Sequence, residues 1–392
     1  MVRSYKYRLY PNREQAGILA TWLNLTRELY NAALQERRDA WQKRRVSVTK
    51  FDQMRVLPKV REGRPEFNDI PIVVLRGVLR RLDKAFAGFF RRVKNGEKPG
   101  YPRFKGRDRY RSLLLDDLGG KTPVVGKQVA VPLLGRVNFK KHRPLDGIPK
   151  AMRITQDAAG HWFVTFACVD VPAKPLPPNE EEVGIDLGIT NFVATSDGGT
   201  FENPRILEAA RIRTERAQRR VSRRRRGSVR RRKAVQLLAV AHQHVQNVRR
   251  QHHIDTARAI VARYGHIYTE DLNIKGLAGS MLAKPIHDAG WASFLGWLAC
   301  KAEEAGRKVI AVDPFGTSQI CSACGVVVRK DLSVRVHRCP DCGYTADRDV
   351  NAARNILRLG RSLRRDAPAV RGRQRPEKGR IDVGSAAAST SN

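Results

Sequence analysis

The stretch VGIDLGITNFVATSDGG, residues 183–199, decides the expected fold of this 392-residue chain. It predicts a buried strand, a glycine, a second strand and a turn. Asp186 lies inside the hydrophobic first strand, where an ionised carboxylate is costly unless it binds something. Asp186 is therefore a candidate functional residue, and the alternative is an acid that only belongs to a turn.

Two further acids occupy comparable settings. Glu270 ends the apolar part of HIYTEDLNI, residues 266–274, which predicts another short buried strand. Asp349 lies in ADRDVNAARNI, where a helix is expected to begin. A strand Asp, a strand Glu and a helix Asp, in that order, can gather around a pair of divalent ions on a ribonuclease H-type sheet. For single acids a helix cap stays open as an alternative, with Asp271 and Asp347 as competing candidates.

Four cysteines form two Cys-x-x-Cys pairs, separated by fourteen residues. Each pair makes a tight turn whose thiolates can share one metal ion, and two pairs complete a tetrahedral zinc site without an open position for catalysis. The alternative, four free thiols, requires two such pairs by coincidence. We interpret Cys168 and Cys300, which have apolar neighbours, as core residues. The predicted zinc ligands are Cys321, Cys324, Cys339 and Cys342.

The chain is strongly basic, with 75 lysines and arginines against 38 acids and a formal net charge of +37. A compact chain with this imbalance repels itself unless a polyanion neutralises it, so the composition predicts a nucleic-acid partner. A ribosomal-type basic protein is the alternative, but such proteins are usually shorter and poorer in Trp and Phe. We expect no signal peptide, because MVRSYKYRLYPN at the N-terminus has no apolar core segment. We also expect no membrane span, because no run approaches about 18 apolar residues. The cysteine pairs are typical of a reducing compartment.

The first 170 residues predict a small β-barrel that is interrupted by helices. Alternation over residues 5–9 predicts a half-buried strand, and residues 129–139 and 151–171 predict further strands, the latter a hairpin. Residues 72–93 predict a helix whose apolar stripe faces the core. The members of this stripe are Leu75, Leu79, Leu82, Phe86 and Phe89.

The second half predicts long helices beside its strands. Residues 205–264 predict two helices joined near Gly227-Ser228, and residues 291–305 predict another. From Ser222 to Lys233 there are eight basic residues and no acid. A solvated charge run is the alternative, but we favour phosphate contact because the run lies at the tip of a helical hairpin. The candidate nucleic-acid-binding residues there are Arg223, Arg224, Arg225, Arg226, Arg230, Arg231 and Arg232.

Together these motifs resemble the TnpB family, the transposon-encoded RNA-guided nucleases that are related to the type V CRISPR effectors. GIDLGITNFVATSDG, YTEDLNIKGL and ADRDVNAARNI resemble the three RuvC motifs of the family and place Asp186, Glu270 and Asp349 at its catalytic positions. SQICSACG with CPDCG resembles the inserted zinc ribbon. RLYPNREQ resembles the opening strand and first helix, and GYPRFK the loop after the helical insertion, so the match runs over nearly the whole chain.

The resemblance implies a multidomain α+β fold. It has an N-terminal wedge β-barrel with a helical recognition insertion, followed by a ribonuclease H-like RuvC domain with an inserted zinc ribbon. Composition after Gly360 adds a disordered tail. The expected limits are 1–12 and 108–175 for the barrel, 13–107 for the insertion, 182–320 and 345–360 for the nuclease, 321–344 for the ribbon and 361–392 for the tail.

The resemblance also implies an RNA-guided endonuclease that cuts double-stranded DNA next to a short adjacent motif. Its implied partners are a guide RNA from the transposon end, one protein per RNA, and the DNA target, in the bacterial cytoplasm at the nucleoid. The implied metals are Mg²⁺ or Mn²⁺ at the RuvC site and structural Zn²⁺ in the ribbon. Lys50 and Arg76 align with positions that contact the adjacent motif. A guided DNA-binding repressor without cleavage and a DNA transposase are the alternatives, and the presence of all three acids favours cleavage.

Overall fold

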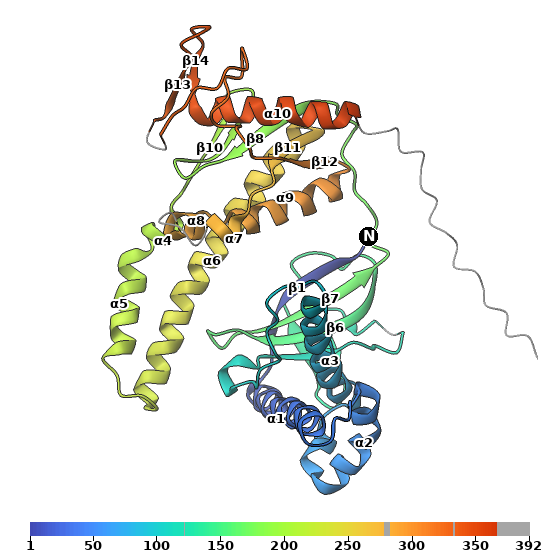
Figure 1. Ribbon diagram of the computed structural model, residues 1–392. Coiled ribbons are helices and arrows are strands. Elements are labelled where there is room, and N and C mark those ends of the chain that lie inside the picture. The colour runs from blue at the N-terminus through green and yellow to red at the C-terminus, as the bar shows by residue number, and fades with distance from the viewer. Residues whose placement is uncertain (121, 278–282, 332–333, 367–392) are drawn as a thin grey trace, which may run out of the picture. The chain divides into compact units, whose positions relative to one another are not determined.

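The computed structural model describes residues 1–120, 122–277, 283–331 and 334–366, which fall into two compact units (Figure 1). Unit 1 contains residues 1–176, 205–252 and 304–306. Unit 2 contains residues 177–204, 253–303 and the described residues from 307 onward. The units interleave along the sequence because the long helix α6 (Val229–Arg263) contributes residues to both.

Unit 1 is built on a seven-stranded antiparallel sheet with the order β2-β6-β7-β1-β5-β4-β3. The predicted alternation is confirmed in its first strand, where Tyr5, Tyr7 and Leu9 are buried. The predicted hairpin is also confirmed, since β6 and β7 pair across a turn that Gly160 N–H closes on Asp157 O at 3.1 Å. The strands are β1 (Arg3–Tyr10), β2 (Ser112–Leu115), β3 (Val124–Val125), β4 (Gln128–Val131), β5 (Gly135–Phe139), β6 (Ile148–Gln156) and β7 (Trp162–Val169).

The expected β-barrel does not close. Among the described residues no ladder joins the edge strands β2 and β3, and β3 is only two residues long. Helix α3 (Ile72–Lys94) covers β2 where another strand would have to pair. At Gly77 of α3 an added Cβ would lie 2.7 Å from Leu114 O, so the helix backbone approaches the strand closely. The sheet therefore stays open, with a helix at its edge.

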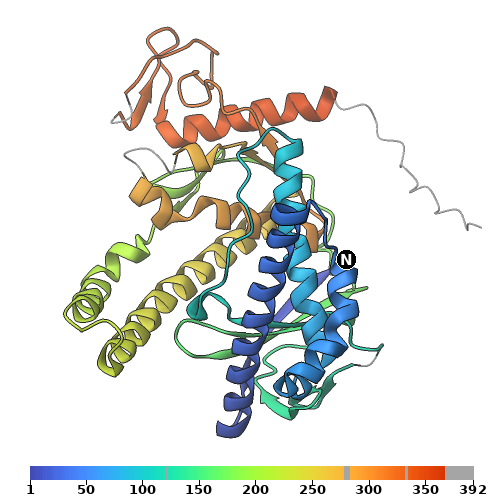
Figure 2. The same cartoon turned by 60° about the horizontal axis from the view of Figure 1, so that its bottom comes forward.

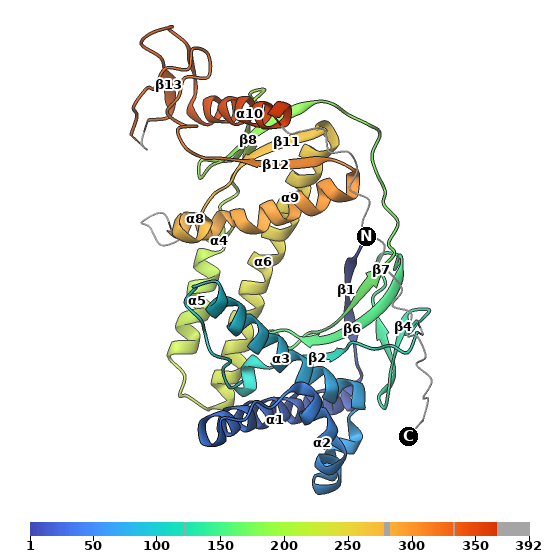
Figure 3. The ribbon, with the colours of Figure 1, turned by 45° about the vertical axis from the view of Figure 1, so that its right-hand side comes forward.

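Residues 13–107, predicted to form a helical insertion, contain α1 (Arg13–Arg44), α2 (Lys50–Gly63) and α3, which lie side by side (Figures 2 and 3). Asn12 caps α1 in a capping box, in which Gln15 N–H donates to Asn12 Oδ1 and Asn12 N–H donates to Gln15 Oε1. The buried apolar residues of these helices form one core with those of the sheet. The insertion is therefore packed onto the sheet and is part of the same unit.

The stripe predicted for α3 packs against the core from Leu75 to Phe86 and leaves it at Phe89. Leu75, Leu79 and Leu82 are buried, whereas Phe86 and Phe89 are half-buried. Arg81 Nη2 donates to the carbonyl of Ser112, the first residue of β2, at 3.0 Å. Beyond that turn α3 extends past the start of β2, and the ring of Tyr101 from the following loop packs against Phe86 and Phe89.

Unit 2 contains a mixed five-stranded sheet with the order β10-β9-β8-β11-β12. The strands β8, β9 and β10 pair antiparallel, whereas β11 is parallel to both β8 and β12. The strands predicted within residues 183–199 and 266–274 therefore form, as β8, β9 and β11. The strands of the sheet are β8 (Glu182–Leu187), β9 (Asn191–Thr195), β10 (Thr200–Glu202), β11 (His266–Glu270) and β12 (Lys308–Val312).

The predicted helices of the second half are present in the described residues. Residues 205–264 give a short α4 (Ile206–Ala209), then α5 (Arg211–Ser222) and α6, and residues 291–305 give α9 (Trp291–Ala305). Two short helices precede α9, namely α7 (Ile274–Leu277) and α8 (Ala283–Ala289). None of the helices in the described part of the chain combines the length and the apolar character that crossing a bilayer requires.

The interpretation of the two isolated cysteines is half right. Cys168 is buried as predicted, but Cys300 is exposed on α9. The buried face of α9 carries Phe294, Leu298 and Ala302, at a spacing of four residues, so position 300 falls on the other side of the helix.

Helix α10 (Arg348–Asp366) lies across the sheet of unit 2 (Figure 1) and touches it at glycines. At Gly184 in β8 an added Cβ would lie 2.1 Å from Ala353 O and 2.6 Å from Leu357 N. At Gly360 an added Cβ would lie 2.0 Å from the ring of Tyr268 in β11. The backbones of α10 and β8 therefore meet without an intervening side chain.

The tail predicted from residue 361 begins too early, because α10 continues to Asp366. Arg361 Nε donates to Glu182 Oε2 at 2.6 Å, and Arg364 donates to Glu182 Oε1 at 3.0 Å and Glu180 Oε2 at 3.1 Å. The arginine-rich composition suggested disorder, but these arginines have acidic partners that are distant in sequence. The remainder of the predicted tail, residues 367–392, lies outside the described residues.

The contact at Gly184 generates a stability prediction. Gly184→Ala is expected to lower the free energy of unfolding by about 3 kcal/mol, because the new methyl group meets helix backbone that cannot rotate away. Gly296→Ala in α9 is the control, since nothing lies within 4 Å of its added Cβ and removing a helical glycine should stabilise by about 0.5–1 kcal/mol. Urea unfolding measures both, and equal effects would contradict the contact.

Candidate active site and metal centre

The three predicted acids come together at one edge of the sheet in unit 2. The register of the parallel strands pairs Ile185 with Thr269, so Asp186 and Glu270 hold neighbouring positions at the ends of β8 and β11. Asp349 lies in the first turn of α10. An added Cβ at Gly188, two residues beyond Asp186, would lie 3.2 Å from Asp349 Oδ2. Elements that are far apart in sequence therefore place three carboxylates around one point.

The pKa of each of the three carboxylates is raised, mainly by burial. Burial raises the pKa of Asp186 well above its usual range, and the negative charges of Glu270 and Asp349 raise it further. Burial also raises the pKa of Glu270, against the hydroxyl of Thr317, which lowers it. Burial and the neighbouring Asp347 raise the pKa of Asp349. Arg348 offsets part of this effect at Asp186, and Arg335 and Arg348 do so at Asp349, but burial outweighs them and all three pKa values stay raised. A buried cluster of carboxylates with raised pKa values is typical of an oxygen-ligand site for divalent cations.

The helix cap that stayed open as an alternative belongs to Asp347. The N–H groups of Asp349 and Val350 donate to Asp347 Oδ1 at 2.8 and 3.3 Å. Asp347, at the end of strand β14 (Thr345–Asp347), therefore begins α10. Asp349 does not cap the helix, so its carboxylate can contribute to the candidate site with Asp186 and Glu270.

Three polar residues support the acids, and their roles were not predicted. Thr317 Oγ1 donates to Glu270 Oε1 at 2.5 Å. Asn355 Nδ2 in turn donates to Thr317 O at 2.9 Å, and Asn351 Nδ2 donates to Ile320 O at 2.8 Å. The two asparagines carried a sequence signal, because they lie four residues apart on the helix of Asp349 and are both buried polar side chains. Thr317 lies in a loop without any such pattern.

The four predicted cysteine ligands form a second centre, with all four Sγ atoms within 4.8 Å of one another. The Sγ–Sγ distances are 3.8 Å between Cys321 and Cys342 and 3.6 Å between Cys324 and Cys339. A tetrahedron with zinc–sulfur bonds of about 2.3 Å has edges of about 3.8 Å, so the donor set fits zinc. Within the described residues this is the one cluster of His, Cys, Asp and Glu drawn together so tightly, and the three acids lie further apart.

The two halves of the cysteine cluster repeat one backbone turn. Gly325 N–H donates to Cys321 O at 2.9 Å, and Gly343 N–H donates to Cys339 O at 3.1 Å. Both glycines have positive φ, 83° and 72°, which side-chain-bearing residues rarely adopt. Ser322 N–H also donates to Asn351 Oδ1 at 2.9 Å, which ties the first turn to α10 next to Asp349.

The predicted arginine run lies between α5 and α6. Gly227 has φ 84°, and Ser228 caps α6 by accepting from Arg231 N–H at 3.1 Å, which confirms the predicted joint. Six of the seven candidate arginines are exposed. The exception is Arg231, which is half-buried and donates to Val221 O and Arg224 O at 2.7 and 3.0 Å, so it holds the turn.

Three further arginines belong with this run and were missed. Arg216, Arg219 and Arg220 line a hollow on α5 together with Arg223 and Arg224. Their spacing of three, four, seven and eight residues places all five on one helical face. The prediction began its basic run at Ser222 and therefore missed a periodic signal that starts earlier.

The two candidates aligned with motif-reading positions have different surroundings in unit 1. Lys50 Nζ lies 3.1 Å from Asp83 Oδ2 in an ion pair. Arg76 is exposed and lines a hollow between α2 and α3 with Arg61 and Asn68. Arg76 is thus presented outward, whereas Lys50 is engaged by an acid.

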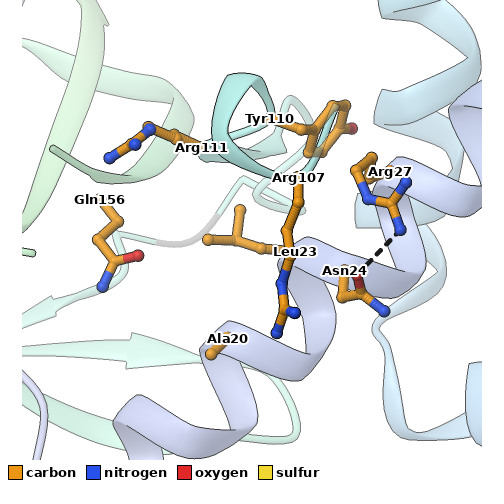
Figure 4. Close-up of a pocket in the computed structure, with 8 residues that line it drawn as sticks. All are labelled: Ala20, Leu23, Asn24, Arg27, Arg107, Tyr110, Arg111 and Gln156. Carbon is orange, nitrogen blue, oxygen red and sulfur yellow. Dashed lines mark hydrogen bonds between the residues drawn. The ribbon is translucent and has the colours of Figure 1, made fainter. Parts of the chain in front are cut away.

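A separate pocket of about 240 Å³ in unit 1 is also cationic (Figure 4). Arg27 Nη2 donates to Asn24 Oδ1 at 3.0 Å, and the Arg107 side chain reaches past Leu23 toward α1. No carboxylate lines this pocket, so its chemistry suits an anion. Its lining residues are Ala20, Leu23, Asn24, Arg27, Arg107, Tyr110, Arg111 and Gln156.

Three family models and several curated relatives match this chain. Family models match as "Helix-turn-helix domain" over residues 1–45, "Probable transposase" over 166–281 and "Cas12f1-like, TNB domain" over 291–356. The chain is 35% identical over 365 residues to a putative RNA-guided DNA endonuclease of Streptomyces pristinaespiralis, covering 91% of this chain and 89% of the relative. It is 27% identical over 382 residues to the putative RNA-guided DNA endonuclease InsQ of Escherichia coli strain K12, covering 92% and 93%.

Among solved structures, that of the mini-RNA-guided endonuclease CRISPR-Cas_phi3 overlaps with 92% of each chain, at 11% identity and a TM-score of 0.45.

The cysteine cluster generates a metal-content prediction. Cys321→Ser is expected to lower the bound zinc from about one ion per chain to near zero, because three thiolates no longer close the tetrahedron. Cys300→Ser, which removes an exposed thiol outside the cluster, should keep the full content. Elemental analysis of the purified proteins makes the comparison, and zinc retained in Cys321→Ser would rule out this ligand set.

The raised pKa of Asp186 generates a stability prediction in magnesium-free buffer. Because the pKa of this acid is higher in the folded than in the unfolded state, its stabilising contribution is present at low pH and is lost as the pH rises through the folded-state value. Asp186→Asn should therefore lose less stability than the wild type between pH 5 and pH 8, by about 1–3 kcal/mol.

Urea unfolding at the two pH values measures this difference without a chelator, so that zinc is retained. Adding Mg²⁺ should stabilise the wild type at pH 8 and leave Asp186→Asn unchanged. Glu202→Gln, an exposed acid on β10 of the same sheet, is the matched control and should follow the wild type. An identical pH dependence in all three proteins would contradict the raised pKa of Asp186.

Proposed function

This chain belongs to the TnpB family of RNA-guided DNA endonucleases, and from that premise we propose that it cuts double-stranded DNA at sites chosen by pairing with a bound guide RNA. The observation that carries the proposal is the convergence of Asp186, Glu270 and Asp349 at one edge of the unit 2 sheet. Guide pairing would supply the sequence choice, while the protein holds the backbone of the heteroduplex and reads a short adjacent motif.

The reaction is hydrolysis of a phosphodiester bond. Water attacks the phosphorus, the bond to the leaving oxygen breaks, and that oxygen takes up a proton. The three carboxylates would hold two divalent ions, Mg²⁺ or Mn²⁺, which supply an activated water and stabilise the leaving oxygen when bound.

The protein's own part in this reaction is positioning. Thr317 orients Glu270 through its hydroxyl, and the Asp347 cap sets the first turn of α10 that carries Asp349. Asp186 is held by the close contact of β8 with α10. We assign the four-cysteine site a structural zinc ion that has no part in the reaction, because four protein ligands leave no open position.

The basic surfaces would hold the nucleic acids. The exposed arginines at the joint of α5 and α6, the arginine face of α5 and the outward-facing Arg76 offer guanidinium groups to phosphates. The proposed partners are one guide RNA from the transposon end per protein and a duplex DNA target. The domain limits stated from the sequence form part of the same proposal, with the tail moved to begin after Asp366.

The test of this function is a cleavage assay with the Asp186→Ala variant. The variant, loaded with guide RNA, should bind target DNA within about twofold of the wild type and cut it at least about 100-fold more slowly, because one carboxylate of the metal seat is gone. Glu202→Gln should cut at the wild-type rate. Equal cutting by Asp186→Ala and wild type would refute the assignment, and guided binding by a wild type that never cuts would favour the repressor.

A further inference from the structure

Four aromatic side chains gather where α3 leaves the core of unit 1. The rings of Phe86 and Phe90 lie 6.3 Å apart at 27°, and Phe89 and Phe90 meet edge to face at 5.2 Å. Tyr101, from the loop after α3, sets its ring edge-on against Phe86 at 5.6 Å and Phe89 at 5.4 Å. We call Phe86, Phe89, Phe90 and Tyr101 the aromatic platform.

The outer rings of the aromatic platform are open to solvent. Phe90 is 61% exposed and Tyr101 is 45% exposed. Packing of the loop onto the helix accounts for the presence of large apolar rings at Phe86, Phe89 and Tyr101. It does not account for the large ring of Phe90, most of which faces solvent. Large rings clustered at the surface mark a binding surface more often than rings that are exposed singly.

The loop that carries Tyr101 is anchored rather than loose. Asn31 of α1 brackets Lys105, donating from Nδ2 to Lys105 O at 3.1 Å and accepting from Lys105 N–H at 2.8 Å. At the other end of the loop, Glu97 N–H donates to Arg92 O in the last turn of α3 at 2.9 Å. The aromatic platform is thus formed before any ligand arrives, which lowers the entropy lost on binding.

The charge around the aromatic platform selects the ligand. Residues 84–107 contain eight lysines and arginines and one acid, Glu97. Asn95 Nδ2 donates to this Glu97 at 3.2 Å, and Arg91, Lys94 and Lys98 are exposed around the rings. Rings on which bases stack, surrounded by cations that meet phosphates, are the combination used by proteins that hold single-stranded nucleic acids.

We propose that the aromatic platform is a stacking site for unpaired nucleotides, with Phe90 and Tyr101 against the bases and Arg91 and Lys94 on the phosphates. The inference rests on the proposed function only in that the chain must handle nucleic acid. Bases inside a duplex are already stacked on one another, so the site should prefer single strands. The neighbouring cations disfavour an apolar protein surface as the occupant, because they would lose water without gaining a counter-charge.

The experiment compares Phe90→Ala with Val93→Ala, an exposed apolar residue on the same helix that lies outside the aromatic platform. Binding of labelled oligouridylate, oligothymidylate and duplex DNA to the full chain, stripped of co-purifying nucleic acid in high salt, is followed by fluorescence anisotropy over a salt series. Phe90→Ala should weaken single-strand binding about tenfold and leave duplex binding unchanged. Phe90→Tyr, which keeps a ring, should retain the affinity.

The salt series separates the roles of rings and cations. Phe90→Ala should lower affinity at every salt concentration without changing the slope of log affinity against log salt, whereas Lys94→Gln should reduce that slope by about 0.7. Oligonucleotides that carry 5-iodouridine should cross-link to the peptides of Phe90 or Tyr101. A stronger effect on oligouridylate would assign the site to RNA, and a stronger effect on oligothymidylate would assign it to a DNA single strand.

Two results would overturn the proposal. One is equal affinity of Phe90→Ala and Val93→Ala, with cross-links elsewhere in the chain. The other is a wild type that self-associates and a Phe90→Ala variant that does not, which would make the aromatic platform a contact between copies of the chain. Asp186→Ala should keep its single-strand affinity, so a failure of the endonuclease assignment remains distinguishable from a failure of this one.

Discussion

The backbone contact between β8 and α10 at Gly184 is the constraint on which the candidate active site depends. Residues 184 and 186 share one face of the strand, because side chains alternate along it. Residues 349 and 353 share one face of the helix, because they are one turn apart. When Gly184 meets the carbonyl of Ala353, Asp186 and Asp349 are therefore brought to the same side. A methyl group at this one position would separate two acids that it does not itself touch.

Helix α10 is positioned at three places along its length. Asn351 and Asn355 bind the chain around Ile320 near its start, the glycine contact holds its middle, and Arg361 and Arg364 pair with acids near its end. The first set is hydrogen bonds made by buried amides, the second is close packing, and the third is ion pairing at the surface, which contributes least. The position of α10 on the sheet is thus set by groups that respond differently to salt and pH. A change in salt or pH alone would therefore weaken only some of these contacts.

The clustering of the three acids and of the four cysteines could be predicted because their proposed chemistry demands particular residue types in particular settings. An aspartate inside VGIDLG and two Cys-x-x-Cys pairs have few alternative explanations. The predictions that failed concerned features that depend on partners distant in sequence. The order at Arg361 and Arg364 requires Glu180 and Glu182, and the open sheet follows from α3 covering β2. The partial exposure of Phe89 depends on where a neighbouring strand begins, and the exposure of Cys300 depends on how α9 is rotated. Thr317 belongs to no pattern, so it becomes visible only when the loop is seen beside Glu270.

The hydrogen bond between Ser322 and Asn351 has a consequence for thermodynamic coupling. It joins the first cysteine turn to α10 two residues from Asp349, so both centres share one rigid helix. If binding of an ion at the thiolates favours the placement of this helix, binding of divalent ions at the carboxylates must favour the thiolate site by the same factor. The proposed zinc site would then act as an effector of the proposed divalent-ion site, and the affinity of each site could be adjusted by substitutions at the other.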